Sequence, residues 1–110
     1  MIDGMNFDGV TKCNWRDIKA IEGAPGIYVR NLWTGNNNKR VDIYEFQAGA
    51  NYGALDTHEV GPEQVYVLSG IFNDGREDHQ TGTFLHHPKG SAHVPQSKYG
   101  CVLLVIFPEG

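Results

Sequence analysis

Short stretches of alternating hydrophobic and polar residues follow one another along the chain after residue 26. This alternation has the period of two that is typical of β-strands. The predicted strands cover residues 27–33, 39–47, 64–72, 82–87 and 101–107. Between the first two lies the sequence Thr-Gly-Asn-Asn-Asn, whose residues favour turns and tolerate a positive φ. Residues 27–47 are therefore predicted to form a β-hairpin.

Glycine is unusually frequent and is spread evenly along the chain. Its 14 copies in 110 residues are nearly twice the usual share of about 7%. Spread in this way, they indicate turns between short strands, which predicts an all-β fold: a sandwich or barrel of the jelly-roll kind. We expect one domain, with a loop-rich N-terminal extension over residues 1–25 and a barrel over 26–110. The extension has room for at most a turn or two of helix before the Gly-Ala-Pro-Gly of residues 23–26.

Both faces of the predicted strand 64–72 are largely apolar. Val65, Val67 and Ile71 point to one side, whereas Tyr66 and Leu68 point to the other. A sheet with one solvated face does not show this pattern, so something must cover each face. We therefore expect a homodimer.

The composition excludes several classes of partner. The chain has 9 Lys+Arg against 13 Asp+Glu, a net charge of −4, and no basic cluster, so we expect no nucleic-acid partner. Its longest apolar run, residues 101–107, is far shorter than the roughly 20 residues that cross a bilayer. We expect no membrane partner either.

The N-terminus and the cysteines indicate a compartment. The first residues, Met-Ile-Asp-Gly-Met-Asn, have neither the basic nor the apolar region of a secretory signal. Cys13 and Cys101 are too few for a disulfide framework. The sequence predicts a cytoplasmic protein with reduced thiols and, at Cys101, an inert buried thiol.

Histidines and carboxylates occur at spacings that suit a metal site. Asp56 and His58 lie two residues apart and share a face if the segment is extended. Glu63 follows after a Gly-Pro turn, and His93 follows the turn formed by residues 88–90. These nitrogen and oxygen donors suit Fe(II), Mn(II), Ni(II) or Zn(II), and they exclude a thiolate site.

The remaining candidates have plainer interpretations. His86 and His87 are adjacent on a strand and point to opposite faces, so one of them could line the barrel, but a position on the strand surface is the favoured interpretation. His79 lies in a polar turn and is expected to be solvated. Glu59, beside His58, is the weaker rival of Asp56 as a metal ligand.

Two motifs resemble those of the cupin superfamily. The segment 82–93, Gly-Thr-Phe-Leu-His-His-Pro-Lys-Gly-Ser-Ala-His, matches every fixed position of the second cupin motif, G-x5-P-x-G-x2-H. Glu63, six residues and Gly70 resemble the end of the first motif. The resemblance covers residues 26–108. It is strongest to the group that contains the C-terminal domain of the anti-sigma factor ChrR and the acetylacetone-cleaving dioxygenases.

The resemblance implies a small RmlC-like barrel, a double-stranded β-helix, which is usually dimeric and holds one metal ion. By position, His58 corresponds to the second histidine of the first motif, Glu63 to its glutamate, and His93 to the histidine of the second motif. Asp56 stands where the first histidine is expected. If Asp56 is a ligand, the site has two histidines and two carboxylates, close to the facial-triad set of non-haem Fe(II). If it is not, the site binds metal weakly or has lost it.

The sequence therefore predicts a single-domain cupin with a divalent metal at Asp56, His58, Glu63 and His93. A metal-dependent enzyme of the dioxygenase type, acting on a small molecule, is the first hypothesis. The alternatives are a non-catalytic, ChrR-like sensory cupin that binds a ligand, and a metal-free cupin.

Overall fold

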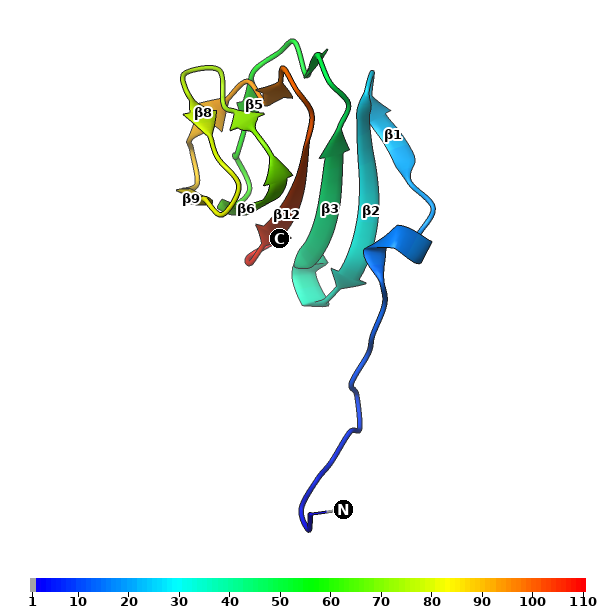
Figure 1. The fold of residues 1–110 in the computed structure, drawn as a ribbon. Helices are drawn as coiled ribbons and strands as arrows, with labels where there is room; N and C mark the ends of the chain where they lie inside the picture. The colour runs from blue at the N-terminus through cyan, green and yellow to red at the C-terminus, as the bar shows by residue number, and fades with distance from the viewer. Residues whose placement is uncertain (1) are drawn as a thin grey trace.

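The computed structural model describes residues 2–110 and consists almost entirely of antiparallel β-structure (Figure 1). The strands are β1 (Ile21–Ala24), β2 (Ile27–Thr34), β3 (Arg40–Phe46), β4 (Ala50–Asn51), β5 (Asp56–Thr57), β6 (Glu63–Gly70), β7 (Phe72–Asn73), β8 (Asp78–His79), β9 (Phe84–His87), β10 (Ala92–His93), β11 (Gln96–Ser97) and β12 (Cys101–Phe107). Two short 3-10 helices, η1 (Trp15–Asp17) and η2 (Asn36–Asn38), complete the described elements. The all-β prediction is confirmed.

The strands form three sheets. The largest has six strands in the order β1-β2-β3-β12-β6-β9; four short strands pair in the order β4-β11-β7-β8, and β10 pairs with β5. The predicted hairpin is present as β2 and β3, and η2 forms its turn. Asn37 and Asn38 there both adopt φ of 59°, a left-handed conformation that asparagine tolerates better than most residues.

The segment before the barrel is only partly separate from it. Residues 2–14 run away from the barrel as an extended segment without regular secondary structure (Figure 1). The single turn η1 agrees with the short helix expected there. The strand β1 pairs with β2 and so joins the large sheet before residue 26. The domain boundary at residue 25 stays a prediction.

The core lies on the inner face of the large sheet and reaches across to the smaller strands. Its buried residues are Ile27, Phe46, Ala50, Val65, Val67, Phe72, Cys101, Leu103 and Val105. Phe46 of the large sheet meets Phe72 of the small sheet edge to face, with ring centroids 6.0 Å apart. Alternate residues of β6 and β12 point into this core, and the two strands pair side by side, with Cys101 opposite Gly70. The close approach at this point requires glycine, since a Cβ at Gly70 would collide with the carbonyl oxygen of Gly100.

Within residues 2–110, none of the helices has the length and apolar character needed to cross a membrane.

Candidate metal centre

Two cross-strand pairs bring the candidate ligands together. His93 of β10 lies directly opposite Asp56 of β5, and Glu63 of β6 lies directly opposite His87 of β9. Residues directly opposite in an antiparallel ladder project from the same face. His93 Nε2 is 3.2 Å from Asp56 Oδ2. Each pair therefore contributes one imidazole and one carboxylate to the same end of the barrel.

His58 is fixed by the loop that precedes β10. Its backbone N–H donates to the carbonyl oxygen of Ser91 at 2.9 Å, and its own carbonyl accepts from the N–H of Gly90 at 2.8 Å. Gly90 has φ of 90°, which glycine adopts without strain. The second motif thus holds the first one in place, because its Gly-Ser turn clamps the backbone of His58 beside His93.

Glu63 is the centre of the cluster. Its side chain is buried, and its Oε1 is 3.5 Å from His87 Nδ1, 3.6 Å from His58 Nε2 and 3.7 Å from His93 Nε2. Atoms that bind one ion at 2.0–2.2 Å are separated by about 3–3.6 Å in octahedral or tetrahedral geometry. The spacing of these donors is close to that range.

Several donor atoms in the cluster have no hydrogen-bond partner among the described residues. These orphaned and fully buried atoms are His58 Nε2, His87 Nδ1 and His93 Nδ1. Buried polar atoms are nearly always paired, and leaving one unpaired costs about 1–3 kcal/mol. Potential ligand atoms lie within 4.8 Å of one another in two overlapping groups: Asp56, His58, Glu63 and His93; and His58, His87 and His93. The donor set fits a divalent metal ion.

The electrostatics favour the protonation states that bind metal. Burial lowers the pKa of His58, although Glu63 and Asp56 oppose this. The hydrogen bond with His93 lowers the pKa of Asp56. Metals bind neutral imidazoles and ionised carboxylates, so both shifts prepare the site for an ion.

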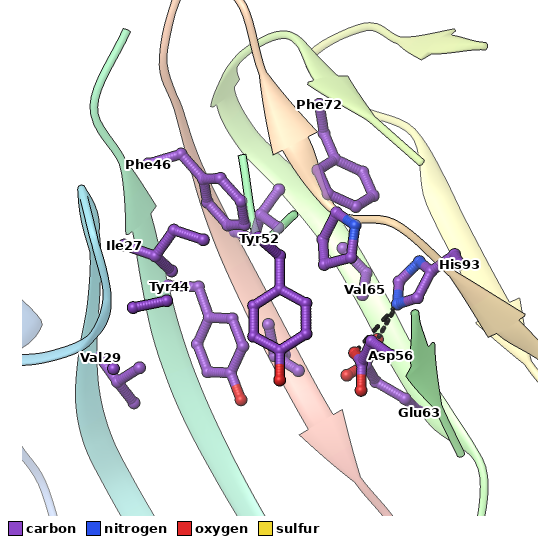
Figure 2. Close-up of a pocket in the computed structure, with 15 residues that line it drawn as sticks. Ile27, Val29, Tyr44, Phe46, Tyr52, Asp56, Glu63, Val65, Phe72 and His93 are labelled. Atoms are coloured by element: carbon purple, nitrogen blue, oxygen red, sulfur yellow. Dashed lines mark hydrogen bonds and ion pairs between the residues drawn. The ribbon is translucent and has the colours of Figure 1, made fainter. Parts of the chain in front are cut away.

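A cavity of about 190 Å³ adjoins the cluster. Asp56, Glu63 and His93 form its polar wall, and the other lining residues are mostly apolar side chains of the core (Figure 2). Two phenol rings also face it, those of Tyr44 and Tyr52. Burial, and next the nearby Glu63 carboxylate, raise the pKa of Tyr44. Its hydroxyl therefore stays protonated and can donate a hydrogen bond into the cavity.

The structure brings together all four residues that the sequence singled out. It also adds His87, for which the sequence favoured a surface position and left a position inside the barrel as the alternative. The pairing of β6 with β9 turns His87 inward and leaves His86 exposed. The expectation for His79 was wrong as well, because His79 is buried and pairs with Asp74 at 2.7 Å. Glu59 is exposed and lies outside the cluster.

Comparison with known proteins settles the family. The family model described as the ChrR cupin-like domain matches residues 9–108. The chain belongs to this family. Among curated protein sequences, none matches this cupin significantly.

Solved structures share the cupin fold at low sequence identity. A chain in the crystal structure of Rhodobacter sphaeroides SigE in complex with the anti-sigma ChrR is 20% identical, with a TM-score of 0.73 over 86% of this cupin and 50% of that chain. An RmlC-like cupin from Shewanella frigidimarina is 18% identical, with a TM-score of 0.73 over 87% of this chain and 88% of that one. A predicted oxalate decarboxylase from Thermotoga maritima is 19% identical, with a TM-score of 0.72 over 89% and 98%. These matches confirm the jelly-roll prediction, and this cupin spans half the length of the matched chain in the ChrR complex.

Proposed function

We propose that this cupin binds one divalent metal ion through Asp56, His58, Glu63 and His93 and uses it on a small molecule in the adjoining cavity. The observation that carries the proposal is the group of three imidazoles around the Glu63 carboxylate, each with one fully buried ring nitrogen that has no hydrogen-bond partner among the described residues. A folded protein keeps such unpaired atoms where a ligand pairs them.

The ligand atoms limit which metal ions can bind and which reactions the site can support. His58, His93 and Glu63 match the two histidines and one carboxylate of non-haem Fe(II) enzymes, and Asp56 adds a second carboxylate. Mn(II), Ni(II) and Zn(II) also accept these ligands. When bound, such an ion would polarise the oxygen atoms of a substrate and, as iron, supply oxygen chemistry. We infer a metal-dependent dioxygenase-type activity on a small molecule that carries a chelating pair of oxygen atoms.

The cavity supports a small and partly apolar substrate. Its volume of about 190 Å³ is below the roughly 300 Å³ at which sites for drug-sized ligands begin. Asp56 and Glu63 would hold the metal at one wall, while the Tyr44 hydroxyl can donate to a substrate oxygen. The apolar core residues would exclude water from the remaining surface. The fold also resembles that of a predicted oxalate decarboxylase, and oxalate is a small dicarboxylate. This resemblance supports a substrate of similarly small size.

Oxygen uptake tests the activity. Protein reconstituted with Fe(II) under anaerobic conditions is mixed with small 1,3-dicarbonyl compounds and then exposed to oxygen in an oxygen electrode. We expect consumption that depends on iron and is lost in His93→Ala but kept in His86→Gln, whose side chain lies outside the cluster. Iron binding without any oxygen uptake would contradict the enzymatic proposal.

A sensory function is the second candidate, and the match to the ChrR cupin-like domain favours it. In this case the same metal and cavity would bind a ligand without converting it. A compound that raises the melting temperature of the metal-loaded protein and is recovered unchanged would support this function over the enzyme.

We also propose that the protein is a homodimer through the outer face of the large sheet. Tyr66 and Phe84 lie directly opposite each other there, and Leu68 follows on the same face. Their exposed fractions are 39%, 56% and 38%, respectively. Exposed apolar clusters of this kind mark interaction surfaces.

Sedimentation velocity tests the dimer. We expect the wild type to sediment as a dimer and the double variant Leu68→Glu/Phe84→Glu as a monomer, since two buried charges per subunit oppose association. Tyr99→Glu, in the turn before β12, is the matched control and should stay dimeric. A monomeric wild type would refute the proposal.

A further inference from the structure

His87 is held inside the barrel by the pairing of its strand. It lies opposite Glu63 in the β6–β9 ladder, and its Nδ1 is 3.5 Å from Glu63 Oε1. That distance is longer than a hydrogen bond, and Nδ1 is fully buried without a partner among the described residues. It does, however, suit two atoms that share one metal ion.

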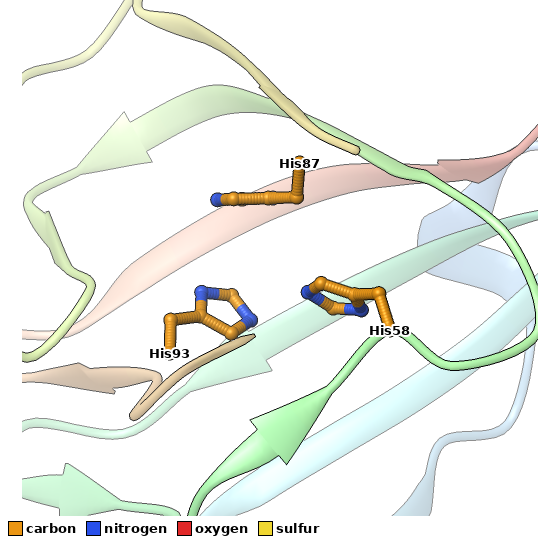
Figure 3. Close-up of side chains that lie close together, drawn as sticks. All are labelled: His58, His87 and His93. Carbon is orange, nitrogen blue, oxygen red and sulfur yellow. The ribbon is translucent and has the colours of Figure 1, made fainter. Parts of the chain in front are cut away.

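The imidazole of His87 faces the two histidines already assigned to the metal centre. Its ring centroid is 5.4 Å from that of His58 and 4.5 Å from that of His93, and His58 and His93 are 4.9 Å apart (Figure 3). One ring nitrogen from each of the three lies within 4.8 Å of those of the other two. The three rings therefore surround a common point from three different segments of the chain.

His86, the neighbouring residue on the same strand, provides a comparison for His87. His86 is exposed, and its Nδ1 is 3.3 Å from the side-chain amide of Gln64. The Nδ1 of His87 has no such partner in the part of the chain that the structure describes, although the side chain is only 14% exposed. Surface placement or simple packing explains His86 but leaves the buried nitrogen of His87 unexplained.

We propose that His87 is a metal ligand that supplies a third imidazole to the centre formed by His58, Glu63 and His93. This rests on the proposed metal binding. A site with Asp56 as its only further ligand has two imidazoles, whereas a site that includes His87 has three. The number of coordinated imidazoles therefore separates the two arrangements.

Pulsed EPR on the Cu(II)-loaded wild-type protein counts the coordinated imidazoles without any mutation. We expect three in the wild type, two in His87→Gln and three in the matched control His86→Gln. Calorimetric titration with Zn(II) alone should show that His87→Gln lowers the affinity at least tenfold, as loss of groups at a metal site typically does, while His86→Gln leaves it unchanged.

The possible failures can be told apart. Two imidazoles in the wild type, or equal zinc affinities for His87→Gln and His86→Gln, would overturn the role of His87 and leave the metal site intact. A wild type that takes up neither Cu(II) nor Zn(II) would overturn both the metal site and this inference.

Discussion

Two histidine–aspartate pairs in this barrel have equally buried imidazoles but different surroundings. His79 is 8% exposed and pairs with Asp74 at 2.7 Å; His93 is 9% exposed and pairs with Asp56 at 3.2 Å. Asp74 also accepts the backbone N–H groups of Arg76 and Glu77, both at 2.9 Å. This pair closes the turn between β7 and β8, and among the described residues neither side chain of the pair has a fully buried polar atom without a hydrogen-bond partner.

The surroundings of the His93–Asp56 pair, by comparison, contain unpaired polar atoms. Within residues 2–110, His93 Nδ1 has no hydrogen-bond partner, and the neighbouring rings of His58 and His87 each carry another unpaired buried nitrogen. Burial alone therefore does not distinguish a structural histidine from a ligand. The distinction lies in whether the remaining polar atoms are satisfied, because an unsatisfied buried nitrogen is unfavourable unless something binds it.

The largest expected effect is the response to metal. At a free ion concentration 100 times its dissociation constant, binding contributes about 2.7 kcal/mol, which corresponds to a rise in melting temperature of roughly 10–20 °C for a domain of this size. The rise should vanish in His58→Ala and persist in His79→Gln. Differential scanning fluorimetry with Zn(II) measures the rise in melting temperature of each variant. An equal rise in the two variants would contradict the distinction between a metal-binding and a structural histidine.

The two sites should also differ in how much their histidines contribute to the stability of the metal-free protein. His79→Leu leaves the buried Asp74 without its imidazole partner, so we expect the free energy of unfolding to fall by about 1–3 kcal/mol. His58→Leu removes an unpaired nitrogen and should change stability by less than about 1 kcal/mol, or raise it. Urea denaturation in EDTA provides the measurement. A larger loss in His58→Leu than in His79→Leu would contradict the assignment of roles.

The smallest expected effect is a dependence on acid pH. Burial opposes ionisation of Asp74, but its hydrogen bonds from His79, Glu77 and Arg76 outweigh this and lower its pKa to about 2. A pKa lowered on folding stabilises the protein above the ordinary value near 3.8, and this contribution is lost as the pH falls toward 2.

Asp74→Asn should therefore lose roughly 1 kcal/mol near neutral pH and show a flatter decline in stability than the wild type between pH 5 and 2. Urea midpoints across this range test it, with the exposed Asp78→Asn as control. Parallel pH curves for the wild type and Asp74→Asn would show that the aspartate contributes nothing through its charge.

Much of the site could be predicted because local spacing determined it. The two-residue separation of Asp56 and His58 placed both at the cluster, and the Pro-Lys-Gly turn brought His93 to them. The turn residues likewise marked the β2–β3 hairpin. These features depend on a few neighbouring residues, and the conformational preferences of those residues follow from their residue types alone.

The role of His87 depended on information that is not local. Phe84 and Leu85 are both apolar, so the pattern of β9 does not show which of the two following histidines points inward. The register that sets His87 opposite Glu63 decides this. His79 was missed for a similar reason, although Asp74 five residues earlier in a turn was a signal for its partner.

The metal content of the purified protein tests the central claim most directly. The protein should be prepared without a chelating column or added metal and examined by elemental analysis. We predict close to one equivalent of iron, manganese, nickel or zinc in the wild type and a large loss in the double variant His58→Ala/His93→Ala. A wild type that is empty as purified and takes up none of these ions on addition would contradict the account.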